Sequence, residues 1–127
     1  MNKKLLLILR IIVALILIQT LRFKFTVHPD SVYIFTKVGL EPFGRIGIGV
    51  LELISAILIL IPRTIWAGAG LTLGILGGAI MMHLTQLGIE INNDGGSLFY
   101  LALGTFIVSG IILFDQRKNI PIIGAKL

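Results

Sequence analysis

Two charged side chains lie inside otherwise apolar stretches of this sequence and are its first candidates for chemistry. Arg10 lies within residues 5–21, and Glu52 lies near the middle of residues 46–62. A charged group in hydrocarbon costs at least about 2.5 kcal/mol, so each needs a partner inside the protein. Arginine suits bidentate pairing with a carboxylate. We therefore predict a buried polar site made of Arg10 and Glu52, either a proton or ligand site or an ion pair that fixes helix register. A further alternative leaves Arg10 extended to lipid headgroups.

His83 is a secondary candidate, in the uncharged stretch of residues 64–88. It could ligate haem or exchange a proton with a quinone, with His28 as its partner; the alternative is a hydrogen-bonded histidine near the membrane surface. The sequence contains no cysteine and no catalytic motif. That excludes thiolate metal sites, iron–sulfur clusters and dithiol chemistry. We predict no catalytic residue and no metal site, so redox chemistry here would need a quinone or a haem.

Three glycines in the same stretch form two consecutive G-x-x-x-G motifs: Gly70, Gly74 and Gly78. In an apolar helix this spacing allows close backbone contact with a neighbouring helix. We predict that these glycines pack inside the protein, with a homo-oligomer interface as the alternative. Gly49, Glu52 and Ala56 form a second face of small neighbours that another helix can approach closely.

The elements that must position these residues are membrane-spanning helices. The chain has 127 residues, of which 56% are hydrophobic and 13% are charged, and its mean hydropathy is +1.01. Soluble domains have about 45–50% hydrophobic and about 25% charged residues. Four apolar runs cover residues 5–21, 46–62, 64–88 and 98–114, and each is long enough to cross a bilayer. These runs lack the alternation of apolar and polar residues that is typical of the strands of a membrane β-barrel. We predict an all-α integral membrane protein, a four-transmembrane-helix bundle that forms a single domain over residues 1–127.

The connection of residues 22–45 contains a further apolar segment. Asp30 or Ser31 can cap a short helix there and Gly39 can end it, so we predict a short interfacial helix between the first two spans. The net charge of +5 comes from basic residues that flank the runs, which favours lipid headgroups over nucleic acid as the partner. With four spans both termini share one side, and the excess of lysine and arginine there predicts that this side is cytoplasmic.

Several short motifs occur in an order that identifies a family. An arginine early in the first run is followed by Phe23-Lys24-Phe25, Gly39-Leu40-Glu41-Pro42, Gly49-Val50-Leu51-Glu52-Leu53, the stretch 58–62 and the stretch 77–83. Over most of the chain this order resembles the DoxX-like family of small bacterial four-helix membrane proteins. The resemblance implies a four-helix bundle in the bacterial cytoplasmic membrane. It also implies a link to membrane redox complexes, because some relatives are named as subunits of quinol-oxidising or thiosulfate-oxidising complexes.

Two functional hypotheses follow from the residues and the resemblance together. The first is an accessory, non-catalytic membrane subunit linked to quinone redox chemistry, with a membrane redox subunit as its partner. The alternative is a small transporter, or a protein that binds a lipid or another small molecule at a site around Arg10 and Glu52. A quinone that co-purifies with the protein favours the first hypothesis, and a water-filled cavity at Glu52 favours the second.

Overall fold

The computed structural model describes residues 1–26, 28–91, 93–122 and 124–126, and its regular elements are helical. The four long helices are α1 (Lys3–Phe25), α3 (Phe43–Leu60), α4 (Ile65–Met82) and α5 (Ser97–Asp115). The short helix α2 (Pro29–Lys37) lies between α1 and α3. Shorter turns are η1 (Pro62–Thr64), the π-helical turn η2 (His83–Leu87), η3 (Arg117–Asn119) and η4 (Gly124–Lys126).

Four segments are long and apolar enough to cross a membrane: Lys3–Phe25, Phe43–Leu60, Pro62–Leu87 and Ser97–Asp115. Large apolar side chains such as Leu15, Ile57 and Ile107 are more than half exposed on their outer faces, as expected for surfaces that contact lipid. The predicted four-span fold and the short helix between the first two spans are therefore confirmed. The first span continues to Phe25, one turn beyond its predicted end at residue 21.

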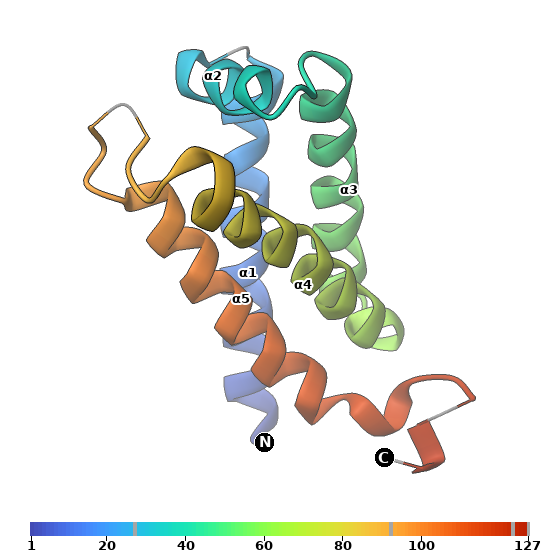
Figure 1. Ribbon diagram of the computed structural model, residues 1–127. Helices are drawn as coiled ribbons and strands as arrows, with labels where there is room; N and C mark the ends of the chain where they lie inside the picture. The colour runs from blue at the N-terminus through green and yellow to red at the C-terminus, as the bar shows by residue number, and fades with distance from the viewer. Residues whose placement is uncertain (27, 92, 123, 127) are drawn as a thin grey trace.

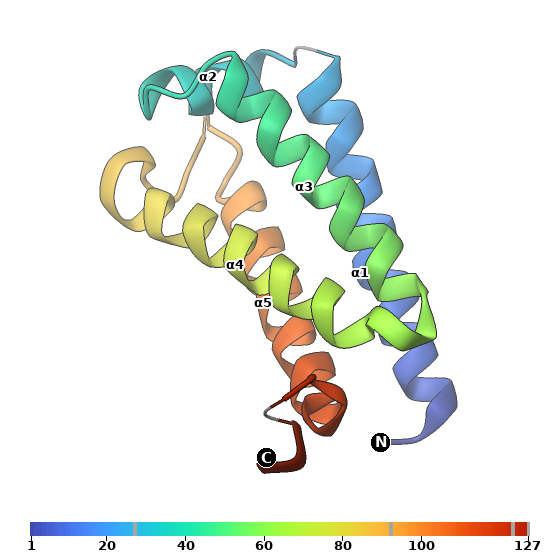
Figure 2. The same cartoon turned by 90° about the vertical axis from the view of Figure 1, so that its right-hand side faces the viewer.

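The long helices form two antiparallel pairs that diverge from one end of the bundle (Figures 1 and 2). Helix α1 packs on α3, α4 packs on α5, and the turn at η1 joins the two pairs. A cluster of fully buried apolar side chains lies where the pairs meet: Val13, Ala14, Leu17, Ala56, Ile59, Ile65, Ala69 and Ile112. Toward the opposite end α3 and α4 separate, and α2 lies across the open end (Figure 2). We call these the closed end and the α2 end.

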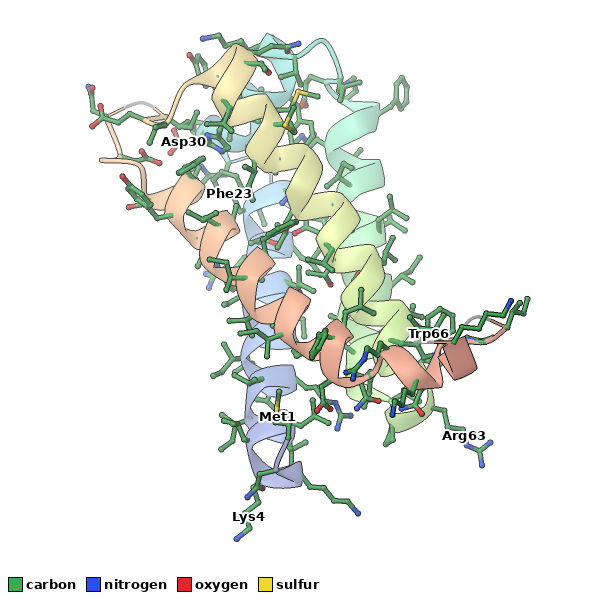
Figure 3. The ribbon with its side chains drawn as sticks, turned by 60° about the horizontal axis from the view of Figure 1, so that its bottom comes forward. Met1, Lys4, Phe23, Asp30, Arg63 and Trp66 are labelled. Carbon is green, nitrogen blue, oxygen red and sulfur yellow. The ribbon has the colours of Figure 1, made fainter. Side chains whose placement is uncertain are left out.

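The charged ends of the chain lie at the closed end. Met1, Lys4 and Arg63 are at this end of the molecule, whereas Asp30 is at the α2 end (Figure 3). The N-terminal ammonium of Met1 lies 3.1 Å from a carboxylate oxygen of Asp115 at the end of α5. The termini and the η1 turn therefore share one side, as predicted; which side faces the cytoplasm stays a prediction.

The start of α2 differs from the predicted capping. His28, rather than Asp30 or Ser31, is the N-cap residue, and its ring Nδ1 accepts a hydrogen bond from the Asp30 backbone N–H at 3.1 Å. Pro29 then occupies the first turn, where its fixed φ and missing N–H suit a helix start. The predicted end is correct, since Gly39 follows the helix with a φ of +78°, a conformation that glycine adopts without strain.

The predicted helix contacts at Gly70, Gly74 and Gly78 are not found. A Cβ atom at any of these three positions would have no neighbour within 4 Å. The close crossing of α3 and α4 lies instead at Gly68, where a Cβ would be 2.4 Å from the backbone nitrogen of Ile59. The reason is the divergence of the helix pairs, because α4 has already left α3 when it reaches the later glycines.

Candidate functional site

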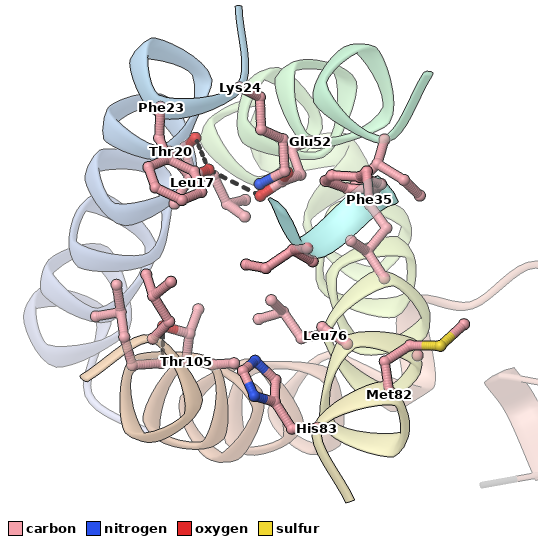
Figure 4. Close-up of a pocket in the computed structure, with 18 of the residues that line it drawn as sticks. Leu17, Thr20, Phe23, Lys24, Phe35, Glu52, Leu76, Met82, His83 and Thr105 are labelled. Carbon is pink, nitrogen blue, oxygen red and sulfur yellow. Dashed lines mark hydrogen bonds and ion pairs between the residues drawn. The ribbon is translucent and has the colours of Figure 1, made fainter. Parts of the chain in front are cut away.

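A crevice of about 330 Å³ lies between the two helix pairs, on the α2 side of the apolar cluster (Figure 4). Ligand sites in proteins commonly measure about 300–1,000 Å³. All five α-helices contribute to its lining, which is mostly apolar and includes Leu17, Phe35 and Leu76. Its polar side chains are few: Gln19, Thr20, Lys24, Glu52, His83 and Thr105.

Glu52 forms the polar centre of one wall. Its side chain is 2% exposed, and its Oε1 lies 2.6 Å from Nζ of Lys24 on α1. Its Oε2 lies 2.8 Å from Oγ1 of Thr20, one helical turn before Lys24. Thr20 Oγ1 is also 2.7 Å from the carbonyl oxygen of Leu17, and its single proton can go to only one of these acceptors at a time. The carboxylate is therefore paired with an ammonium but keeps spare capacity to accept hydrogen bonds.

Arg45 holds the end of α1 that carries Lys24. Its buried guanidinium donates to the backbone carbonyl of Lys24, and its Nε donates to the carboxylate of Glu41 at 2.9 Å. The last carbonyls of a helix lack partners within the helix, and a cation there also interacts favourably with the helix dipole. Close packing adds to this anchor, since a Cβ at Gly49 would lie 2.6 Å from the ring of Phe25. The predicted small face of α3 therefore does contact α1.

The predicted pair of Arg10 and Glu52 does not form. Both residues are buried as predicted, at 8% and 2% exposure, but Arg10 donates from Nε to the carbonyl of Ile59 and from Nη2 to the carbonyl of Leu60, each at 2.8 Å. These carbonyls belong to the last turn of α3 and need donors from outside the helix. Because they lie seven and eight residues beyond Glu52, the guanidinium is about 10–12 Å away from that carboxylate along the helix. Arg10 thus stabilises the closed end of the bundle.

His83 lies in the wall opposite Glu52, where its ring points into the crevice (Figure 4). It is the first residue of the π-helical turn η2, which ends at Gly88 with a φ of +78°. Turns of this kind occur frequently at functional sites. The ring Nδ1 lies 2.9 Å from the carbonyl oxygen of Gly88. The structure does not bring His28 to this site, because His28 caps α2 and stacks on Phe23 with ring centroids 4.7 Å apart.

Asp94 organises the loop beside His83. Burial acts to raise the pKa of its carboxyl, but hydrogen bonds from the backbone N–H groups of Ile91, Gly96 and Leu98, together with the charge of His83, hold that pKa below its ordinary value. The carboxylate thereby satisfies backbone donors before and at the start of α5. Asp94 thus supplies an acceptor for free backbone N–H groups at the start of α5, whose N-cap residue is Gly96.

The sequence interpretation did not assign Lys24 and Thr20 to the site. One signal was present, because Thr20 and Lys24 are four residues apart and so lie on the same face of a helix. Ending the first span at residue 21 removed Lys24 from that face. A lysine in the last turn of a membrane helix is ordinarily assigned to the lipid headgroups; here its ammonium turns inward to Glu52.

Comparison with known proteins identifies the family of this chain. Residues 8–104 match the DoxX-like family. No curated protein and no solved structure gives a significant match. The match covers most of the chain and includes Arg10, Lys24, Glu52 and His83. The chain therefore belongs to the DoxX-like family.

Proposed function

We propose that this DoxX-like protein binds a small amphiphilic molecule dissolved in the membrane and acts as an accessory, non-catalytic membrane subunit. The observation that carries the proposal is the crevice of about 330 Å³, which is apolar over most of its lining and has the Lys24–Glu52 ion pair in one wall. Such a combination of apolar walls with a few placed polar groups is typical of small-molecule sites. The apolar walls hold the body of the ligand and the polar groups orient its head.

The position of the polar groups gives the ligand a direction. Lys24 lies in the last turn of α1 and His83 follows the last turn of α4, so both are near the α2 end. Leu17 and Leu76 line the crevice closer to the apolar cluster. The head of the ligand therefore points to the α2 end and its apolar part toward the middle of the bundle.

Two glycines mark the route into the crevice. Gly74 and Gly78 line it, are exposed, and lie in the second half of α4. Exposed residues in a membrane span face the acyl chains. A ligand can thus enter sideways from the bilayer between α3 and α4, and the missing side chains keep this entrance wide.

An isoprenoid quinone has the required form, with a polar ring and an apolar tail. Lys24 Nζ can donate a hydrogen bond to a quinone carbonyl, while the apolar wall excludes water. A bound quinone would supply redox chemistry, and the residues of this chain would bind and orient it. Haem fits less well, because His83 is the only histidine among the described lining residues.

The test is the chemical analysis of molecules that stay bound after mild detergent extraction. Ala102 lines the crevice, so Ala102→Phe fills it, whereas Ala67 is half-buried outside the lining and Ala67→Phe is the matched control. We expect mass spectrometry to find one amphiphile enriched over bulk lipid in the wild type and in Ala67→Phe, and depleted in Ala102→Phe. Equal amounts in all three proteins would overturn the proposal.

A further inference from the structure

The hydrogen bonding of His83 fixes the position of its proton. Nδ1 lies 2.9 Å from the carbonyl oxygen of Gly88. A carbonyl oxygen can only accept a hydrogen bond, so Nδ1 is the donor and carries the proton. In the neutral ring Nε2 then has a lone pair and no proton. The π-helical turn thus presents a hydrogen-bond acceptor at the tip of the ring.

This acceptor has no partner in the part of the chain that the structure describes. The ring is 5% exposed and points into the crevice (Figure 4). Its neighbour Phe99 meets it edge to face, with centroids 5.5 Å apart, and offers no polar proton. Asp94 interacts with the ring through its charge, but its carboxylate accepts hydrogen bonds from the backbone. An acceptor that faces a mostly apolar crevice gains a hydrogen bond when a bound molecule brings a donor to it.

We propose that the ligand of this crevice carries a hydroxyl group, as an alcohol or a phenol, and donates its proton to Nε2 of His83. The inference rests on the proposed function, because it needs a ligand in the crevice. It adds the chemical class of the head group: His83 selects a hydroxyl over an ether or a carbonyl at this position.

The wall of the crevice that contains Glu52 does not select a ligand hydroxyl in the same way. Oε1 of Glu52 already contacts the Lys24 ammonium at 2.6 Å, and Oε2 has the hydroxyl of Thr20 within 2.8 Å. Lys24 is a donor only and suits an acceptor on the ligand. Oε1 of Glu52 has no hydrogen-bond donor besides the Lys24 ammonium, whereas Nε2 of His83 faces the crevice with neither a donor nor a cation beside it in the described residues, so a ligand hydroxyl gains most by facing His83.

The experiment uses two probes that differ only in the donor, para-decylphenol and its methyl ether para-decylanisole. Binding to the wild type, His83→Phe and Ala102→Phe in nanodiscs is measured at mildly alkaline pH. We expect the wild type to bind the phenol more tightly than the ether by roughly two- to tenfold, the effect of one hydrogen bond. His83→Phe should bind the two probes equally, and Ala102→Phe should bind neither.

Each other outcome has a separate meaning. If neither probe binds the wild type, or Ala102→Phe binds both as well as the wild type does, the proposed function itself fails. If the wild type binds both equally, the ligand site stands and the hydroxyl inference is overturned. A phenol preference that persists in His83→Phe overturns it as well and assigns the acceptor to another residue, such as Glu52.

A second measurement does not depend on a variant that folds normally. The ¹⁵N NMR spectrum of histidine-labelled wild type reports which ring nitrogen is protonated. We expect Nδ1 of His83 to carry the proton, and the Nε2 resonance to shift when para-decylphenol is added but not when para-decylanisole is added. A proton on Nε2 in the ligand-free protein would overturn the inference.

Discussion

The ion pair of Lys24 and Glu52 gives the sharpest quantitative prediction. Lys24→Met leaves the Glu52 carboxylate, which is 2% exposed, with Thr20 as its only side-chain partner among the described residues. Removing one member of a buried ion pair costs about 3–5 kcal/mol, and we expect a loss of that size. Glu52→Gln should cost less, roughly 1–3 kcal/mol. The glutamine side chain can still accept the hydrogen bond of Thr20, and the Lys24 side chain, which is 13% exposed, can extend toward the headgroups.

Two double variants show whether Lys24 or Arg10 is the partner of Glu52. Each single variant leaves one member of the ion pair without its partner, which is the main cost of breaking a buried pair, and the double variant leaves neither. Lys24→Met with Glu52→Gln should therefore recover at least about 2 kcal/mol of the summed losses. Arg10→Met should itself cost roughly 3–5 kcal/mol, because it removes two charge-assisted hydrogen bonds to α3. When Arg10→Met is combined with Glu52→Gln, the two losses of stability should add within about 0.5 kcal/mol, as is usual for distant sites.

The assay is equilibrium unfolding of the purified protein in mixed micelles, followed by circular dichroism for each single and double variant. Additive losses for Lys24 and Glu52 would refute the pairing and the site built on it. A coupling of several kcal/mol between Arg10 and Glu52 would show instead that these two charges meet.

Three further predictions follow from the loops and glycines. Gly68→Ala should destabilise the protein by about 1–3 kcal/mol, because its Cβ would meet the α3 backbone, whereas Gly74→Ala should be neutral or stabilise it by up to about 1 kcal/mol in thermal unfolding. Asp94 has a lowered pKa, so its contribution should be present above the ordinary value of 3.8 and disappear as the pH falls through the lower folded-state value; Asp94→Asn should abolish this acid dependence of unfolding. Topology reporters should place the C-terminus in the cytoplasm and residues 93–96 outside, and the reverse pattern would refute the assignment.

The sequence was sufficient for the fold because the constraint on the backbone is strong. In hydrocarbon every backbone polar group needs an internal partner, so four long apolar runs predict four helices without knowledge of their contacts. The same physics correctly required a partner for each buried charge. It could not name the partners, because the carbonyls of Ile59 and Leu60 are invisible in a pattern of side chains.

The glycine motif shows the other limit of the sequence. Gly70, Gly74 and Gly78 have the spacing of a close helix contact, yet only a crossing angle decides which glycine of α4 meets α3. That angle is set at the η1 turn and by the apolar cluster around it. The π-helical turn at His83 likewise has no periodic signal, so the position of its ring in the crevice wall could not be predicted.

The position of Arg10 has a consequence for biogenesis. Helix α1 is synthesised before α3, and among the described residues the long-range polar partners of its Arg10, Thr20 and Lys24 side chains lie on α3. While α1 is alone in the bilayer, the Thr20 hydroxyl can still donate to the Leu17 carbonyl, but the Arg10 guanidinium and the Lys24 ammonium lack their partners on α3, and the arginine alone costs at least about 2.5 kcal/mol. The arrival of α3 supplies all their partners at once, so the α1–α3 hairpin is the first unit to assemble. The α4–α5 hairpin docks on it afterwards, and fragments separated at the turn between Pro62 and Arg63 should reassemble when they are made together.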